Sequence, residues 1–178
     1  MSVELVIGGA RSGKSAYAER QALESGRAVT VIVTARSLDA EMGARIAHHR
    51  ALRPAPWRTV EAPFDLAGAL RAEAQDGRFL IVDCLTLWAT NHLCPPELPA
   101  TPSTDWAAAR DELLDTVPRL HGQIVFVSNE IGWGVVPLGE LTRRFVDEVG
   151  RLNQALAQRC DRVTLVAAGL SLRLKDRP

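Results

Sequence analysis

Near its start the chain reads Val3-Glu4-Leu5-Val6-Ile7-Gly8-Gly9-Ala10-Arg11-Ser12-Gly13-Lys14-Ser15. From Gly8 onward this matches the pattern of a phosphate-binding loop, in which two glycines five positions apart are followed by lysine and a hydroxyl residue. Such a loop needs a buried strand before it and a helix after it. The apolar run 3–7 supplies the strand, and the pattern of residues 15–24 predicts the helix. The stretch therefore predicts a nucleotide-binding protein of the P-loop class.

Each part of this loop has a physical role in holding a nucleotide. Glycines allow backbone conformations in which successive N–H groups converge on phosphate oxygens, and the following helix directs its positive dipole end at the same anion. Lys14 is expected to reach the β and γ phosphates, and Ser15 to place its hydroxyl on Mg²⁺. The predicted phosphate-contacting residues are Gly8, Gly9, Ala10, Arg11, Ser12, Gly13, Lys14 and Ser15.

An acidic residue after another apolar run completes the predicted magnesium site. Asp83 follows Phe79-Leu80-Ile81-Val82, which predicts a buried strand. Open α/β sheets bind ligands at the carboxyl ends of their strands, and a carboxylate there holds the metal of many P-loop proteins. We expect Ser15 and Asp83 to bind Mg²⁺, with Asp83 acting directly or through water. Ser128-Asn129-Glu130 follows a further predicted strand and is expected to face the substrate.

Apolar runs alternate with helical patterns along the rest of the chain. Strands are predicted at residues 5–7, 28–33, 79–82, 124–127 and 163–166, and a short run at 57–61 is a further candidate. Helices are predicted at 15–24, 38–52, 64–74, 85–92, 105–120 and 141–158, with Ser103 or Thr104 capping the fifth. Parallel strands need crossover connections, which this alternation supplies. The predicted fold is α/β: a P-loop NTPase-like (RecA-like), mainly parallel sheet with helices on both faces, in a single domain over residues 1–178.

Composition excludes several classes of protein. Hydrophobic residues make up 47% of the chain, and no stretch approaches the roughly 18 apolar residues of a membrane span. Lys+Arg and Asp+Glu are both 21, so there is no net field to hold a nucleic acid, and a nucleotide is the better partner. The N-terminus has no basic region before its apolar run, so a signal peptide is not expected and the predicted location is the cytoplasm.

The cysteines and prolines point to no additional chemistry. Cys84, Cys94 and Cys160 lie far apart, without the pairing of a disulfide framework or the close spacing of a zinc site. The proline-rich segment 94–104 cannot continue a helix or a central strand. We predict that it is a surface excursion.

A histidine pair stands in a basic setting within residues 39–54. His48 and His49 are two of the four histidines, and Arg45, Arg50 and Arg53 lie nearby. A neutral imidazole can attack phosphorus and form a phosphoramidate, while arginines stabilise the phosphate charge. The alternative is a solvated pair near a helix C-terminus, where the dipole favours such residues. Metal binding by the pair is less favoured, because consecutive helix positions point apart.

Further motifs extend almost to the end of the chain. They are Leu38-Asp39-Ala40-Glu41-Met42, His48-His49-Arg50 with Arg53-Pro54, Trp57-Arg58-Thr59, Val127-Ser128-Asn129-Glu130-Ile131-Gly132-Trp133-Gly134-Val135-Val136-Pro137 and Gly150-Arg151-Leu152-Asn153-Gln154. Together with the loop they resemble the bifunctional adenosylcobinamide kinase / adenosylcobinamide-phosphate guanylyltransferases of cobalamin biosynthesis. The P-loop alone indicates only a superfamily, whereas the joint set is specific to this family.

The resemblance implies two reactions. ATP or GTP phosphorylates the aminopropanol hydroxyl of the corrinoid adenosylcobinamide, and GMP then passes from GTP to the new phosphate, giving adenosyl-GDP-cobinamide and pyrophosphate. In the family the second reaction uses a guanylylated histidine, and His48 stands at the matching position, with His49 as the fallback. The resemblance also implies a homo-oligomer, a trimer. The further GTP contacts that it implies are Thr34, Ala35, Arg36, His49, Arg50, Ala51, Leu52, Glu61 and Asp83.

Two features depart from the family pattern, and two other functions stay open. Family members often carry Glu where Asp83 stands, and the segment 94–104 matches no family motif. From the residues alone, the chain could also be a simple small-molecule kinase without a histidine adduct, or a non-catalytic P-loop switch. The preferred phosphate donor, and whether the two reactions share a pocket, are not predicted.

Overall fold

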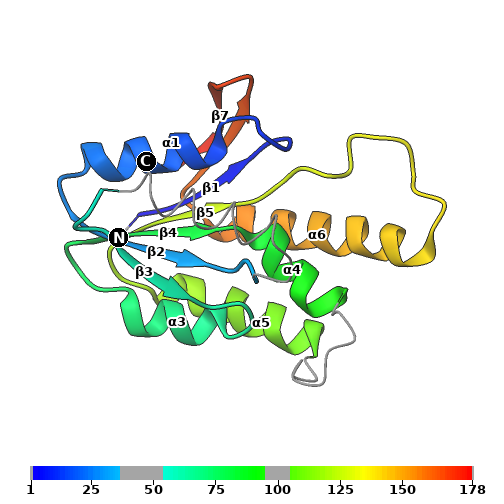
Figure 1. The fold of residues 1–178 in the computed structure, drawn as a ribbon, viewed down its shortest axis with the longest axis horizontal. Helices are drawn as coiled ribbons and strands as arrows, with labels where there is room; N and C mark the ends of the chain where they lie inside the picture. The colour runs from blue at the N-terminus through cyan, green and yellow to red at the C-terminus, as the bar shows by residue number, and fades with distance from the viewer. Residues whose placement is uncertain (1, 37–53, 95–104, 178) are drawn as a thin grey trace.

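The protein forms one seven-stranded sheet flanked by helices (Figure 1). The structure is a computed structural model and describes residues 2–36, 54–94 and 105–177. The strand order is β3-β2-β4-β5-β1-β6-β7, and neighbouring strands are parallel except β6 and β7. The strands are β1 (Ser2–Ile7), β2 (Ala28–Val33), β3 (Arg58–Glu61), β4 (Arg78–Asp83), β5 (Gln123–Val127), β6 (Arg162–Ala167) and β7 (Leu170–Asp176). The helices are α1 (Lys14–Glu24), α3 (Leu66–Glu73), α4 (Leu85–Leu93), α5 (Trp106–Thr116), the 3₁₀ turn η1 (Val117–Arg119) and α6 (Glu140–Arg159).

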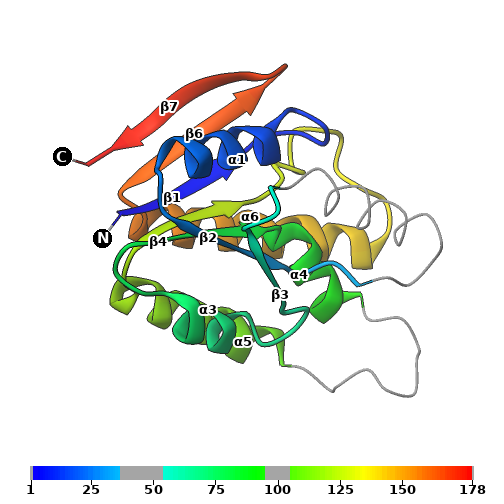
Figure 2. The same cartoon turned by 60° about the vertical axis from the view of Figure 1, so that its left-hand side comes forward.

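Helices cover both faces of the sheet. Helix α1 packs on one face against β1, β4 and β5, whereas α3, α4, α5 and α6 form a layer on the other (Figure 2). Successive strand residues alternate between two apolar cores, because side chains in a strand point to opposite faces. In β1, Val6 packs toward α1 and Leu5 packs toward the four-helix layer. The predicted α/β architecture, a mainly parallel sheet with helices on both faces, is confirmed.

All the predicted strands form, and the candidate at 57–61 becomes the edge strand β3. The prediction missed β7, which pairs antiparallel with β6 through a two-residue turn at Ala168 and Gly169. Both turn residues have positive φ, 51° and 79°, as tight hairpin turns require. Strand β7 alternates leucine with polar residues and is largely exposed, so it lacks the continuous apolar run that marks the buried strands. The predicted helix at 38–52 and the segment 95–104 lie outside the described residues.

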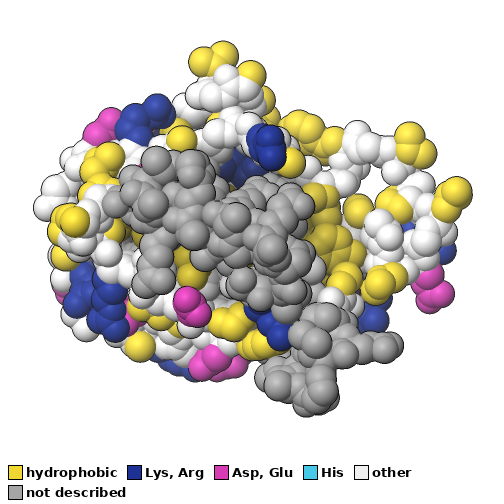
Figure 3. All heavy atoms as spheres, in the orientation of Figure 1, with side chains coloured by type: hydrophobic (Ala, Val, Ile, Leu, Met, Phe, Trp, Pro, Cys, Tyr) yellow, Lys and Arg dark blue, Asp and Glu magenta, His cyan; other side chains and the backbone are white. Residues whose placement is uncertain are grey.

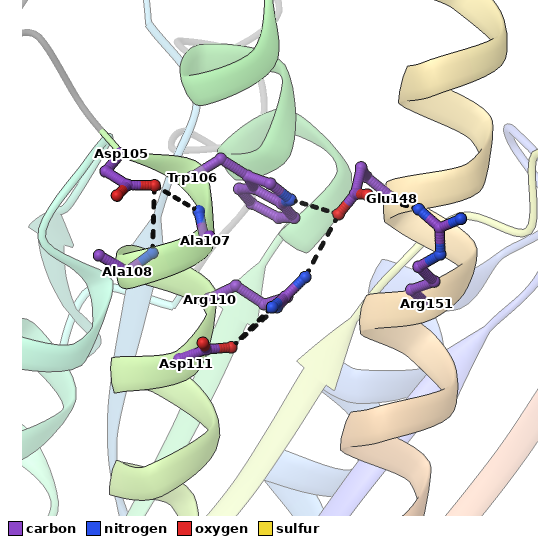
Figure 4. Close-up of polar contacts among 8 residues, drawn as sticks. All are labelled: Asp105, Trp106, Ala107, Ala108, Arg110, Asp111, Glu148 and Arg151. Atoms are coloured by element: carbon purple, nitrogen blue, oxygen red, sulfur yellow. Dashed lines mark hydrogen bonds and ion pairs between the residues drawn. The ribbon is translucent and has the colours of Figure 1, made fainter.

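Helix α5 corrects one prediction about its cap. Its N-cap is Asp105, whose carboxylate accepts hydrogen bonds from the backbone N–H groups of Ala107 at 2.9 Å and Ala108 at 3.3 Å (Figure 4). The prediction that Ser103 or Thr104 caps this helix is therefore wrong. A carboxylate both satisfies the free N–H groups and interacts favourably with the helix dipole, so the helix begins directly after it.

Helices α5 and α6 are joined by a polar cluster around Glu148. Its carboxylate accepts a hydrogen bond from Trp106 Nε1 at 2.7 Å and pairs with Arg110 at 3.4 Å and Arg151 at 2.6 Å (Figure 4). These hydrogen bonds and ion pairs lower the pKa of Glu148 although burial acts in the opposite direction. The cluster fixes α6 beside α5 in the layer that covers the sheet.

Glu4 is a charged residue in the middle of the sheet. Its side chain in β1 is 1% exposed and accepts hydrogen bonds from Thr164 in β6 at 2.6 Å, Arg173 in β7 at 3.1 Å, and Gln21 and Tyr17 in α1 at 3.1 and 3.3 Å. A buried carboxylate costs free energy unless it is paired and hydrogen-bonded. The network therefore joins α1, which follows the phosphate loop, to three strands.

Glu4→Ala is expected to lower the free energy of unfolding by about 3 kcal/mol, because it leaves the buried partners of the carboxylate unpaired. The loss is expected at the low end of the range for a broken buried ion pair, because the Arg173 side chain is partly exposed. Urea denaturation followed by circular dichroism measures the change. The control is Glu24→Ala, which removes the same charge from an exposed position at the end of α1. Equal stability of the two variants would contradict the structural role of the network.

Within the ranges that the structure describes, no helix is both long enough and apolar enough to cross a membrane.

Candidate nucleotide-binding site

The phosphate loop connects β1 to α1 and is packed against the end of β6 and the turn that follows it. Gly8 has a φ of 152°, and a Cβ atom there would lie 2.1 Å from the carbonyl oxygen of Val166 in β6. Gly13 has a φ of 101° and is the N-cap of α1. A side chain at Gly8 would clash with the neighbouring strand, and one at Gly13 would be strained. The glycine pattern is therefore required by the geometry of this loop.

Lys14 is the first residue of α1, and its ammonium lies against the loop. The residue is 6% exposed, and Nζ donates to the carbonyl oxygen of Gly9 at 2.6 Å and to Ser12 Oγ at 3.5 Å. Burial lowers the pKa of Lys14, while the nearby Cys84 and Asp83 act to raise it. A positive charge, the amino end of a helix and the loop amides thus meet at one point, an arrangement suited to bind phosphate.

The two predicted magnesium ligands lie at the same edge of the sheet. Ser15 is in the first turn of α1, and Asp83 ends β4, close enough to Lys14 to affect its pKa. No group of three or more His, Cys, Asp or Glu side chains that could hold a metal occurs in the described part of the chain. A site of one hydroxyl and one carboxylate fits Mg²⁺, because this ion keeps several waters and takes further ligands from substrate phosphates.

Thr34, directly after β2, is hydrogen-bonded to other residues of the protein. It is fully buried. Its hydroxyl donates a hydrogen bond to the carbonyl oxygen of Cys84 at 2.6 Å and accepts one from the Cys84 N–H at 3.0 Å. Its carbonyl oxygen accepts from Asn91 Nδ2 at 2.8 Å. Thr34 therefore holds the end of β2 against the end of β4, and its contact with GTP stays a prediction.

Burial, and next the charge of Asp83, raise the pKa of the Cys84 thiol to about 11, so this thiol is protonated at neutral pH.

The next predicted contacts follow the ends of β2 and β3. The guanidinium carbon of Arg36 lies 5.2 Å from the centre of the Phe64 ring, within range of a cation–π contact. Glu61 ends β3 and is exposed, at the rim of an open cavity next to Phe64. Ala35 is partly buried. The described site residues therefore gather at the carboxyl ends of β1, β2, β3 and β4, whereas His48, His49, Arg50, Ala51 and Leu52 lie outside the described residues.

The family was decided by comparison with known proteins. Residues 4–174 match the model of a family described as "Cobinamide kinase / cobinamide phosphate guanyltransferase". The chain belongs to this family. The family membership predicted from the sequence motifs is thus confirmed.

Curated relatives of this cobinamide kinase / guanyltransferase family member cover nearly its whole length. The bifunctional adenosylcobalamin biosynthesis protein CobP of Pseudomonas aeruginosa is 56% identical over an alignment of 178 positions that covers 98% of each chain. The bifunctional adenosylcobalamin biosynthesis protein CobU of Escherichia coli K12 is 38% identical over 179 residues, covering 96% of this chain and 98% of the relative. These matches therefore extend over nearly the full length of both this chain and the relatives.

Solved structures of distant proteins share the fold. The flagellar accessory protein FlaH from Methanocaldococcus jannaschii superposes with a TM-score of 0.51 at 13% identity, covering 99% of this chain and 79% of FlaH. An ATPase from the type III secretion system of pathogenic bacteria has the same TM-score and identity, with 97% of this chain and 57% of the ATPase covered. These likenesses bear on the fold alone, and they support the predicted P-loop NTPase-like class.

A run of exposed apolar residues follows the site in this family member. The connection from β5 to α6 carries Trp133, Val135, Val136 and Leu138, which are 69%, 95%, 72% and 97% exposed. Hydrophobic side chains gather along this extended connection, at the right of Figure 3. Exposed apolar groups of this kind often mark a surface that meets a ligand or a partner.

Proposed function

We propose that the chain phosphorylates the hydroxyl of adenosylcobinamide with ATP or GTP and then transfers GMP from GTP to the new phosphate. The products are adenosyl-GDP-cobinamide and pyrophosphate. The observation that carries the proposal is the intact phosphate loop, with Lys14 buried against it, in a member of the cobinamide kinase family. The exposed apolar connection after β5 is compatible with a large corrinoid substrate, since such a ring needs apolar surface to bind.

In the kinase step the protein acts mainly by positioning and by electrostatics. The loop amides and Lys14 hold the β and γ phosphates, and no protein nucleophile is needed, because a loose phosphoryl-transfer transition state demands little covalent chemistry. Mg²⁺ held by Ser15 and Asp83 would neutralise charge that develops on the phosphate oxygens. The shorter arm of Asp83, compared with glutamate, favours a contact through water.

In the transfer step His48 is the proposed nucleophile. An imidazole nitrogen bonds to the α-phosphorus of GTP, the bond from that phosphorus to the bridging oxygen breaks, and pyrophosphate leaves. An oxygen of the corrinoid phosphate then displaces the histidine. The motif resemblance supports His48 over the neighbouring His49. Assembly into a trimer rests on the same resemblance and stays a prediction.

The test is a product assay with the complete chain. The protein is incubated with adenosylcobinamide, ATP, GTP and Mg²⁺, and the corrinoids are separated and identified by mass spectrometry. We expect adenosylcobinamide phosphate first and adenosyl-GDP-cobinamide afterwards. Phosphorylation without the GDP product would indicate a simple kinase, and nucleotide binding without either product would indicate a P-loop switch. Each of these results would contradict the proposal.

A further inference from the structure

The segment Ser128-Asn129-Glu130 follows β5 and is fixed beside the phosphate loop. The backbone N–H of Ser128 donates to the carbonyl oxygen of Val6 at 2.9 Å, and that of Glu130 donates to the carbonyl oxygen of Gly8 at 3.0 Å. These bonds continue the pairing of β5 with β1 past the end of β5 and, at Gly8, past the end of β1. The main chain of Glu130 is therefore joined to the first glycine of the loop.

This attachment is one residue away from the loop carbonyl that holds the lysine. Gly8 is followed by Gly9, whose carbonyl oxygen accepts the 2.6 Å hydrogen bond from Lys14 Nζ. In loops of this pattern the lysine reaches the β and γ phosphates. The main chain of Glu130 is thus anchored next to the part of the loop at which the terminal phosphate is expected.

Asn153 directs the Glu130 side chain. It lies in α6, is 5% exposed, and its Nδ2 donates to Glu130 Oε1 at 3.1 Å and to the carbonyl oxygen of Asn129 at 3.2 Å. From the other side, Thr86 Oγ1 in α4 accepts from the Asn129 N–H at 2.8 Å. A buried amide costs free energy unless it is hydrogen-bonded. Both hydrogen bonds of the amide nitrogen go to the segment 129–130, so Asn153 orients the carboxylate, whereas its own Oδ1 has no hydrogen-bond partner among the described residues.

A carboxylate held beside a loop that binds anions needs a chemical reason. Its negative charge repels the nucleotide phosphates and so opposes their binding. Asp83, at the end of the adjacent strand β4, already supplies the carboxylate proposed for the metal. The remaining requirement of phosphoryl transfer to an alcohol is a group that takes the hydroxyl proton, and a carboxylate fills this role in kinases.

We propose that Glu130 is the catalytic base of the kinase step and that Asn153 is its positioning residue. This inference rests on the proposed function. The acceptor hydroxyl oxygen forms a bond to the γ-phosphorus, the bond from that phosphorus to the β,γ-bridging oxygen breaks, and the nucleoside diphosphate leaves with its electron pair. The hydroxyl proton moves to the Glu130 carboxylate. The guanylyl transfer step has no such proton to remove, because its acceptor is already a phosphate.

The experiment compares Glu130→Gln with the wild type in both reactions. We expect kcat for phosphorylation of adenosylcobinamide to fall about 100-fold, with KM for the corrinoid changing less than about twofold. Nucleotide affinity should stay the same or rise, because the variant lacks the repelling charge. Guanylyl transfer to preformed adenosylcobinamide phosphate should be unchanged. Glu140→Gln is the matched control, since it removes a carboxylate from an exposed position at the start of α6.

Asn153→Ala tests the positioning role. Alone, this substitution should lower kcat for phosphorylation about 10-fold. In the Glu130→Gln background it should lower kcat by less than about a further twofold, because a residue that acts through Glu130 has no effect once the Glu130 carboxylate is removed. Additive losses would overturn the role of Asn153. Kinase kcat of Glu130→Gln within about threefold of the wild type, or an equal loss in both reactions, would overturn the role of Glu130. A wild-type chain that never phosphorylates adenosylcobinamide would instead refute the proposed function.

Discussion

Lys14→Met is expected to lower kcat/KM of the kinase reaction about 1,000-fold, the largest loss in that reaction from any single change. Methionine keeps the length and apolar stem of the side chain but removes the ammonium. Lys14 is 6% exposed, and its ammonium is already oriented by the carbonyl oxygen of Gly9, so it can stabilise the transferred phosphate with little reorganisation. Steady-state kinetics with adenosylcobinamide and ATP measures the loss.

The matched control is Arg20→Met, which removes a positive charge from an exposed position of the same helix. It should keep kcat/KM within about twofold of the wild type. A Lys14→Met enzyme with more than about one tenth of wild-type activity would contradict the role of the lysine. Guanylyl transfer measured in Lys14→Met also tests whether the two reactions share a nucleotide pocket. A similar loss of transfer activity indicates that one loop serves both reactions, and wild-type transfer activity indicates separate nucleotide sites.

His48→Ala is expected to lower guanylyl transfer at least about 1,000-fold while the kinase reaction persists, because only the transfer passes through the histidine adduct. Protein incubated with α-labelled GTP and Mg²⁺ should carry an acid-labile, base-stable label, and this label should be lost in the variant. Mass spectrometry of the labelled peptide identifies the residue.

Two further histidine variants complete this test. His121→Ala changes an exposed histidine after η1 and should label like the wild type. His49→Ala distinguishes the two neighbours, since loss of label in that variant alone would identify His49, and not His48, as the nucleophile. Label on neither residue, with transfer intact, would remove the covalent mechanism.

The phosphate loop could be predicted because its chemistry lies in consecutive residues. Strand, glycines, lysine and hydroxyl follow one another directly, and the pattern fixes both the turn and the ligand class. The position of Asp83 at the end of a strand could be predicted for a related reason, because buried parallel strands have continuous apolar runs. Its role toward Mg²⁺ stays a prediction, based on the rule that open α/β sheets bind ligands where their strands end. The histidine pair became informative only together with the motifs of the family resemblance.

Other parts of the molecule depend on contacts between residues distant in sequence. The edge strand β7 has no continuous apolar run, and its place is set by pairing with β6 and by the bond from Arg173 to Glu4. The cap of α5 was misassigned because Ser, Thr and Asp are all good caps and stood in adjacent positions.

From the sequence alone came the nucleotide class, the α/β layering, the family and the residues of the phosphate loop. Only the tertiary structure brought Asn153 to Glu130, a pair 23 positions apart, and engaged the hydroxyl of Thr34 with Cys84, 50 positions away. The physical reason is that hydrogen bonds act over about 3 Å, so a side chain finds its partner only after strand order and helix packing have brought distant segments together.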